Sequence, residues 1–294
     1  MESMWEHEDQ PHWRDYLMAV FFASFFPVAR LFLDSIIFEK SARRLLFSGE
    51  KKVTKKRLLE VNEKKVSKFT ESAWKLTYYM FTTTTLLLSA RNEPWFGKTE
   101  HFWIEWPNHA IKFKLKVLYA FQCGFYVYSV AALMVWETRR KDFGVMMAHH
   151  FITIGLIAFS YVQGSYRAGI STLLLHDISD VFLEIAKLCK YSHFEVGASV
   201  CFGLFALSWF VLRLVIFPFW IIWSISVEVM QYLDLGGNKE FKQYYFQSTL
   251  LIMLFIFHIY WWILICRMLV KLFRDSGKVS DDVRSALLLP KLQP

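Results

Sequence analysis

The chain has 294 residues, of which 55% are hydrophobic and 18% aromatic, while only 20% are charged. A soluble globular domain carries roughly 25% charged residues and fewer aromatic ones, and a disordered chain is far less apolar, so both classes are excluded. The 12 glycines and 7 prolines are too few for a collagen-like or linker-rich chain. These values predict an integral membrane protein made of several apolar helices.

Seven stretches are long and apolar enough to cross a bilayer, which takes about 20 residues of helix. They are residues 16–38, 72–90, 113–136, 146–163, 168–189, 197–227 and 245–272. No cleavable signal peptide is evident before the first one, so we expect it to remain as an anchor. The sixth contains Pro218, which predicts a kink or a tilt. The sequence therefore predicts an all-α bundle of about seven transmembrane helices that encloses an intramembrane site.

Lysine and arginine are concentrated in alternate connections between these spans. Residues 39–71 carry eleven of them, and the connections after the third and fifth spans and the tail are also basic. Basic loops tend to face the cytosol, so the pattern predicts a lumenal N-terminus and a cytosolic C-terminus. The charge pattern also divides the chain into three regions. Residues 1–65 contain the first span and a basic segment, residues 66–273 contain the other spans, and residues 274–294 form the cytosolic tail.

Two connections have a composition of their own. Residues 51–68 carry eight lysines and arginines with apolar residues between them, which favours a helix lying on anionic lipid and, second, attraction of an anionic substrate. Nucleic-acid binding is not expected, because membrane spans follow at once and aromatic residues are few. Residues 94–108 contain three tryptophans, which are typical of a membrane interface on the lumenal side.

Ionisable side chains within the spans are costly in lipid and therefore mark candidate functional sites. Arg30 and Asp34 are four residues apart on one helix face and are expected to form a structural ion pair. His149 and His150 are adjacent, so their side chains leave the helix about 100° apart and cannot aim equally well at one atom. One of them can take part in chemistry while the other holds position.

The fifth span carries a stripe of acidic residues. Asp177, Asp180 and Glu184 follow the spacing of one helix face. His176 and Lys187 extend the stripe, and Lys187 is expected to pair with Glu184. Counted from the short turn between the fourth and fifth spans, His149 and Asp180 lie at a similar depth, and Asp177 lies one turn deeper. The sequence therefore predicts that these four residues meet.

Arg213 lies near the middle of the sixth span and requires an anionic partner, either the Asp177 and Asp180 pair or a substrate group. The two histidines and two aspartates fit three chemistries: acyl transfer from a thioester, metal-dependent hydrolysis, and proton relay in a transporter. Adjacent histidines are a poor chelate, since metal-binding histidines on a helix are usually four residues apart. This spacing disfavours a metal site, but the residues alone leave the choice open.

Two stretches resemble the two halves of the Lag motif of ceramide synthases. Residues 139–150 read R-R-K-D-F-G-V-M-M-A-H-H, and residues 176–187 read H-D-I-S-D-V-F-L-E-I-A-K. The surrounding chain, about 66–273, resembles a TLC domain, and the stretch S-W-F-V-L-R-L-V-I-F-P-F-W around Arg213 fits as well. Animal relatives often carry a homeobox-like insert after the first span. The segment here is too short for one, so the resemblance is to a plant- or fungal-type member.

The resemblance implies a multi-pass enzyme of the endoplasmic reticulum that joins a fatty acyl-CoA to the amine of a sphingoid base (sphinganine or phytosphingosine), giving (dihydro)ceramide and CoA. It implies no cofactor and no metal, with membrane lipids as further partners, and a homodimer is compatible with it. By family analogy, the connection 228–244 influences the acyl chain length. The implied catalytic residues are His149, His150, Asp177 and Asp180, and the implied substrate-binding residues are Arg139, Arg140, Lys141 and Arg213.

Acyl transfer can follow two routes in such a site. A histidine can act as general base while the amine attacks the thioester, or a neutral imidazole can attack the thioester and hold the acyl group until the amine arrives. An acyl-imidazole needs the dry cavity that a membrane bundle supplies, so we favour this covalent route, with His149 as carrier and His150 as base or positioning group. Two alternatives stay open: an intramembrane metal-dependent lipid hydrolase, and a TLC protein that senses or carries lipid without catalysis.

Overall fold

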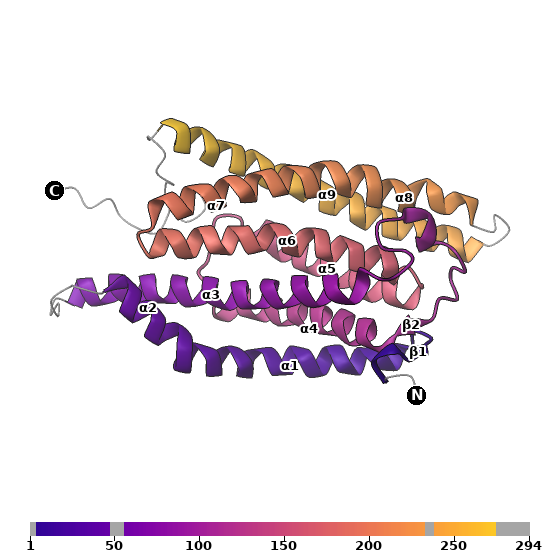
Figure 1. The fold of residues 1–294 in the computed structure, drawn as a ribbon, viewed down its shortest axis with the longest axis horizontal. Helices are drawn as coiled ribbons and strands as arrows, with labels where there is room; N and C mark the ends of the chain where they lie inside the picture. Colours follow the sequence, from indigo (N-terminus) through magenta and orange to yellow (C-terminus); the bar gives the residue numbers. More distant parts are fainter. Residues whose placement is uncertain (1–3, 48–55, 233–237, 275–294) are drawn as a thin grey trace.

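A computed structural model of the chain describes residues 4–47, 56–232 and 238–274, with their side chains except those of 56–61 and 238–243. Nearly all of it consists of long helices that lie side by side along one axis (Figure 1). The helices are α1 Tyr16–Leu33, α2 Glu39–Leu46, α3 Lys56–Ala90, α4 Phe113–Val135, α5 Phe143–Val162, α6 Tyr166–Tyr191, α7 Glu195–Ser208, α8 Trp223–Ser226 and α9 Asn238–Arg274. The short elements are the antiparallel strands β1 Glu8–Asp9 and β2 Ile111–Lys112, with Glu8 opposite Lys112, and the 3-10 helices Met4–Glu6, Trp13–Asp15, Thr99–Phe102 and Glu228–Gln231.

Two stretches of π-helix join neighbouring helices into longer segments. Asp34–Phe38 connects α1 to α2, and Trp209–Ile222 connects α7 to α8. The second stretch contains Pro218, which has no N–H to donate and would clash with a preceding carbonyl in a regular α-helix. The backbone around Pro218 has the wider winding of a π-helix, and the sixth predicted span continues through the proline.

Each predicted span lies within one helical segment, to within one residue at its ends. Five segments of the described chain are long and apolar enough to cross a membrane, namely Trp13–Leu46, Phe113–Val135, Phe143–Val162, Glu195–Gln231 and Tyr244–Arg274. The other two, α3 and α6, are more polar: residues 82–85 of α3 are all threonine, and α6 carries the acidic stripe. A multi-pass helical membrane protein is confirmed, whereas the count of seven spans stays a prediction.

One end of the bundle, which we call the capped end, is closed by the N-terminal segment and the connection between α3 and α4, on the right of Figure 1. Trp95 and Trp103 of this connection are only 3% and 2% exposed, and the Trp103 indole N–H donates to Ser224 Oγ at 2.9 Å. These two tryptophans therefore face other helices and not the outer surface, while their depth relative to the membrane stays a prediction. They fill the space between the ends of the helices, where a buried indole N–H requires an acceptor.

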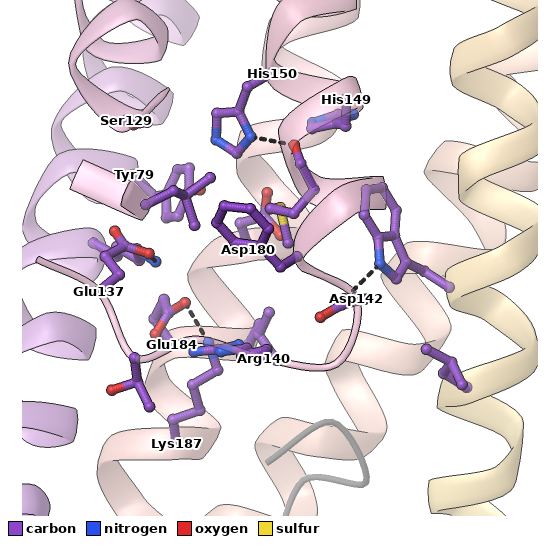
Figure 2. A pocket seen from close by; sticks show the side chains of 18 of the residues that line it. Tyr79, Ser129, Glu137, Arg140, Asp142, His149, His150, Asp180, Glu184 and Lys187 are labelled. Carbon is purple, nitrogen blue, oxygen red and sulfur yellow. Dashed lines mark hydrogen bonds and ion pairs between the residues drawn. The ribbon is translucent and has the colours of Figure 1, made fainter. Parts of the chain in front are cut away.

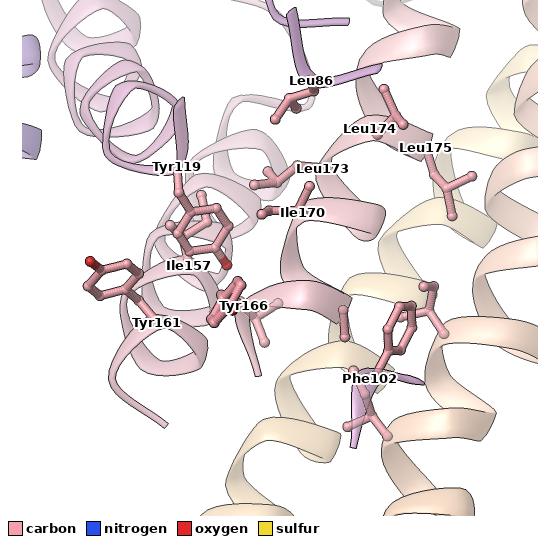
Figure 3. Close-up of a cluster of buried hydrophobic side chains, with 14 of the residues drawn as sticks. Leu86, Phe102, Tyr119, Ile157, Tyr161, Tyr166, Ile170, Leu173, Leu174 and Leu175 are labelled. Carbon is pink, nitrogen blue, oxygen red and sulfur yellow. The ribbon is translucent and has the colours of Figure 1, made fainter. Parts of the chain in front are cut away.

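The main hydrophobic core lies directly behind this cap (Figure 3). Its buried members include Leu86, Phe102, Tyr119, Ile157, Tyr161, Tyr166, Ile170, Leu173, Leu174 and Leu175. The tyrosines of this core use their hydroxyls as well as their rings. Tyr119 shares a 2.6 Å hydrogen bond with Ser160 Oγ, and Tyr166 donates to the carbonyl of Ala110 at 2.6 Å. These bonds link α4 to α5, and α6 to the cap.

Candidate active site

A cavity of about 130 Å³ opens at the opposite end of the bundle, where α5 begins and α6 ends (Figure 2). We call this end the pocket end and the cavity the outer cavity. Its walls come from α3, α4, α5, α6, α7, α9, the π-helical stretch Trp209–Ile222 and the connection between α4 and α5. Its charged lining residues are Lys75, Glu137, Arg139, Arg140, Asp142, Asp180, Glu184, Lys187 and Arg213. So many ionisable groups around one cavity in a membrane bundle indicate a functional site.

His149 and His150 both line the outer cavity from α5. Their rings are nearly perpendicular, at 88°, with centroids 5.5 Å apart. His150 Nδ1 lies 2.7 Å from the carbonyl oxygen of Met146, which can only accept, so the proton is on Nδ1 and Nε2 carries the lone pair. Nδ1 of His149 is buried and has no hydrogen-bond partner among the described residues. The His149 ring packs against Trp261, whose indole N–H donates to Asp142 at 3.0 Å.

A second, narrower cavity of about 40 Å³ extends from His149 toward the capped end. We call it the inner cavity. Its lining residues come from α4, α5, α6, α8 and α9, and none of those that the structure describes is Asp, Glu, Lys or Arg. His149 and Tyr126 line both cavities. His149 therefore stands where a charged cavity at the end of the bundle meets an uncharged one inside it.

Arg213 forms part of the outer cavity wall and is only 3% exposed. Its Nη2 donates to Asp180 Oδ2 at 2.7 Å and to the carbonyl of His176 at 2.8 Å. The guanidinium also lies over the ring of Trp209, 3.9 Å from its centroid. A buried cation requires an anionic partner, as expected from the sequence. Asp180, and not Asp177, is this partner.

Asp177, about one helical turn before Asp180 on α6, is fully buried and lines neither cavity. Gln122 of α4 donates an amide N–H to Asp177 Oδ2 at 2.8 Å. In the described part of the chain, no hydrogen bond joins Asp177 or Asp180 to His149 or His150. The structure thus brings Asp180 and both histidines to one cavity and places Asp177 behind its wall.

The three basic residues expected to bind substrate lie in the connection between α4 and α5. Arg139 is exposed, lines the outer cavity and lies over the ring of Phe143 at 4.4 Å. Arg140 also lines the cavity, and its Nη2 lies 3.1 Å from Glu71 Oε1. Lys141 is exposed and is not part of the lining. Two of the three residues are therefore placed to meet an anionic ligand at the mouth.

Two pairings that helical spacing predicts are confirmed. Arg30 Nε lies 3.5 Å from Asp34 Oδ2, on the segment formed by α1 and α2. Lys187 Nζ lies 2.6 Å from Glu184 Oε1, and both residues line the outer cavity. Residues four or three apart on one helix are neighbours whatever the rest of the fold does.

A group of ion pairs at the mouth of the outer cavity was not expected from the sequence. Lys75 Nζ of α3 lies 3.2 Å from Glu71 Oε1 and 2.7 Å from Glu137 Oε2. The spacing of Glu71 and Lys75 is a local signal that could have been noticed. Glu137 comes 62 residues after Lys75, so its contribution depends on the packing of α3 against the end of α4. The group ties the connection that carries Arg139 and Arg140 to the bundle.

His258 of α9 is a further residue that the sequence analysis missed. It is fully buried, and its Nε2 lies 2.9 Å from Nε2 of His176. His176 Nδ1–H donates to the carbonyl of Thr172 at 2.6 Å, so its Nε2 accepts the proton of His258. A single histidine in an apolar span gives no such signal. Across the described residues, no three side chains of His, Cys, Asp or Glu come close enough together to hold a metal ion.

Comparison with known proteins gives a consistent result. The TLC domain family matches residues 68–267. Ceramide synthase 1 LOH3 of Arabidopsis thaliana is 48% identical over 96% of this chain and 93% of its own length. Ceramide synthase LOH2 of the same plant is 48% identical over 92% of this chain and 90% of its own length, and ceramide synthase LOH1 is 48% identical over 96% and 93%. These matches confirm the resemblance seen in the two halves of the Lag motif, and the chain belongs to the TLC domain family.

Proposed function

We propose that this chain is a ceramide synthase, which transfers the acyl group of a fatty acyl-CoA to the amine of a sphingoid base and releases CoA. The observation that carries this proposal is the 48% identity to ceramide synthases of Arabidopsis thaliana over at least 92% of the chain. The geometry supports it, because a histidine pair lies where a charged cavity meets an uncharged one.

The two cavities suit the two parts of an acyl-CoA. Its phosphates are anionic and stay in water, and Arg139 and Arg140 at the mouth of the outer cavity can pair with them. Its acyl chain is apolar and gains free energy by leaving water for the inner cavity. In this arrangement the thioester lies between the two parts, next to His149 and His150.

We infer that His149 carries the acyl group between two steps. A ring nitrogen of neutral His149 attacks the thioester carbonyl, the C–S bond breaks, and CoA leaves as a thiolate. The amine then attacks the acyl-imidazole carbon, so that a C–N bond forms and the bond to His149 breaks. The proton lost by the amine goes to His150 Nε2, whose lone pair is available because Nδ1 is bonded to Met146.

The two aspartates act through other side chains in this proposal. Asp180 holds Arg213 at the wall of the outer cavity, where positive charge stabilises the oxygen that becomes negative during attack on the carbonyl. Asp177 accepts a hydrogen bond from Gln122 and so fixes α6 against α4. Both are positioning residues, whereas His149 and His150 touch the reacting atoms.

The proposal includes an orientation in the endoplasmic reticulum membrane. Acyl-CoA is a soluble donor, so the pocket end faces the cytosol, and the N-terminus at the capped end is lumenal (Figure 1). The basic connections support the same orientation. Tags at both termini, probed by protease in sealed microsomes, test it: the N-terminal tag should be protected and the C-terminal tag cleaved. Protection of both tags, or of neither, contradicts the orientation.

The activity is tested with the purified full chain, a series of acyl-CoAs and sphinganine, with ceramide measured by mass spectrometry. Formation of ceramide together with free CoA is expected, and no product with any acyl-CoA would refute the proposal. Incubation with acyl-CoA alone, followed by intact mass measurement, tests the covalent route. An acyl adduct should form, disappear in His149→Ala and persist in His150→Ala. Metal content measured on the same preparation addresses the hydrolase alternative, which requires a stoichiometric metal.

A further inference from the structure

The inner cavity is bounded along four helices, over eleven residues on α5 and over seven on each of the other three. Its lining runs from His149 to Ser160 on α5, from Tyr126 to Tyr119 on α4, from His176 to Gly169 on α6, and from Leu254 to Gln247 on α9. The second member of each pair lies nearer the capped end, because α5 runs toward that end and the other three helices start there. The cavity therefore has a floor formed by Tyr119, Ser160, Gly169 and Gln247.

Polar side chains join the helices across this floor. Tyr119 and Ser160 share a hydrogen bond of 2.6 Å, which links α4 to α5. Gln247 Nε2 donates to Ser165 Oγ at 3.1 Å, which links α9 to the turn before α6. The walls above are largely apolar, with Leu156, Leu173, Leu251 and Leu254 among them. An apolar chain that enters from His149 thus meets a hydrogen-bonded barrier at the floor.

The Tyr119 side chain lies across the cavity and against the backbone of Gly169. A Cβ atom at Gly169 would lie 2.1 Å from the Tyr119 hydroxyl oxygen and 3.2 Å from Ser160 Oγ, so glycine provides the space that the ring uses. Tyr119 is 2% exposed and stacks near Tyr161 with ring centroids 6.0 Å apart. The ring is therefore held in place from two sides.

A third, smaller cavity lies on the other side of Tyr119. It is lined by Asp15, Tyr16, Ala19, Tyr119, Ala120, Cys123, Ile157 and Tyr161. Tyr119 and Ile157 are the residues that it shares with the inner cavity. Tyr119 and Ile157 therefore lie between the two cavities, and Tyr119 is the larger of these two side chains.

We propose that Tyr119 limits the length of the acyl chain that the enzyme accepts. This rests on the proposed acyl transfer with His149 as the acceptor of the chain. Along α5, which carries the acceptor His149 and the longest wall, the eleven helical steps from His149 to Ser160 correspond to roughly 16 Å at 1.5 Å per residue. An extended chain advances about 1.2 Å per bond, one third of the length of an extended residue, so this depth holds about 14 to 16 carbons.

The family expectation assigned chain length to the connection 228–244, of which residues 233–237 and the side chains to 243 lie outside the described part of the chain. Ile225 and Gln247, on either side of this connection, both line the inner cavity. The connection therefore starts and ends beside the same floor. Tyr119, which comes from α4, has the largest side chain of the four floor residues, and a single substitution can remove it.

The test uses the purified full chain, sphinganine and saturated acyl-CoAs from 14 to 24 carbons, with kcat/KM measured for each. Wild type should prefer chains of about 14 to 16 carbons and lose at least about tenfold by 20 carbons. Tyr119→Ala should move the preferred length upward by about four carbons, the equivalent of one helical turn. Gly169→Ala should move it downward, because the new Cβ displaces the Tyr119 ring into the inner cavity.

Two variants serve as controls. Tyr119→Phe keeps the ring and should keep the length limit. Tyr166→Ala removes another buried tyrosine of the same core, one that lines none of the three cavities, and should leave the chain-length profile as in wild type. An active Tyr119→Ala with the wild-type profile overturns the inference and leaves the proposed function standing. If Tyr119→Ala does not fold, an unchanged profile in Gly169→Ala overturns it. A wild type inactive with every acyl-CoA refutes the proposed function itself.

Discussion

The two ends of the bundle are built from similar helices, but one end is filled with side chains and the other holds a cavity. At the capped end, aromatic side chains such as Trp103 and Tyr166 fill the space between helices and donate hydrogen bonds to Ser224 and to the carbonyl of Ala110. At the pocket end, the helices leave a cavity of about 130 Å³ with His149 at its inner limit. Aromatic side chains therefore close the capped end of the bundle, whereas the pocket end has space for a ligand.

Two buried tryptophans, one at each end, show which residues contribute to stability alone and which also contact the proposed active site. The indole N–H of Trp103 and that of Trp261 each have a buried acceptor, at 2.9 Å and 3.0 Å. Trp103 lies in the cap, far from the outer cavity lining, whereas the ring of Trp261 packs against the ring of His149 with centroids 5.2 Å apart. Loss of the indole hydrogen bond at either end should therefore lower stability by a similar amount, whereas only the loss at the pocket end should lower activity.

The largest effect is expected at the junction of the two cavities. His149→Ala removes the proposed acyl carrier and should lower kcat by at least about 10³-fold, with the thermal unfolding temperature close to that of wild type. The matched change at the capped end is His109→Ala. His109 is fully buried and its Nδ1 lies 3.0 Å from the carbonyl of Gly164, so its loss should lower stability more than kcat. Near-normal turnover of His149→Ala would contradict the proposal that the pocket end carries the chemistry.

A smaller effect is expected from the acidic stripe. Asp180→Asn removes the charge that balances buried Arg213 at the cavity wall and should lower kcat by about 100-fold. Asp177→Asn keeps the shape of a residue that lines neither cavity and should cost about tenfold or less. Measuring kcat and the unfolding temperature of both variants shows which substitution lowers turnover more. Equal losses in the two variants would show that position relative to the cavity does not matter.

Trp103 and Trp261 allow the two ends to be compared with the same substitution. Trp103→Phe and Trp261→Phe each delete one indole hydrogen bond and should each reduce stability by about 1 kcal/mol. Trp261→Phe should also lower kcat by about tenfold, because the ring that packs on His149 shifts. Trp103→Phe should retain the kcat of wild type. A larger loss of kcat in Trp103→Phe than in Trp261→Phe is the result that contradicts this assignment.

The smallest effect is expected at the mouth. Arg139→Ala should raise the KM for acyl-CoA by about fivefold at low salt, and by less at 1 M salt, where charge pairing is screened. Lys141→Ala removes a neighbouring positive charge that does not line the outer cavity and should change KM by less than about twofold. Steady-state kinetics at two salt concentrations distinguish them. If Lys141→Ala has the larger effect, the anion-binding site lies outside the cavity.

Contacts between residues close in sequence were the easiest to predict. Arg30 with Asp34 and Glu184 with Lys187 are paired because the α-helix itself places them on one face. The burial of Trp95 and Trp103 was not predicted, because composition alone does not tell a residue that faces lipid from one that faces another helix end. His258 was missed because a lone histidine carries no spacing signal, and its partner His176 is 82 residues away.

The sequence by itself determined the membrane class, the positions of the long helices and the resemblance to ceramide synthases, since length, hydropathy and the two halves of the Lag motif are properties of the chain read along its length. The tertiary structure alone decided that Arg213 pairs with Asp180, that Asp177 lies behind the cavity wall, and that Tyr119 closes the inner cavity. Helical periodicity fixes which residues share a face. It does not fix how far each helix is rotated about its axis against its neighbours, and that rotation determines which side chains meet.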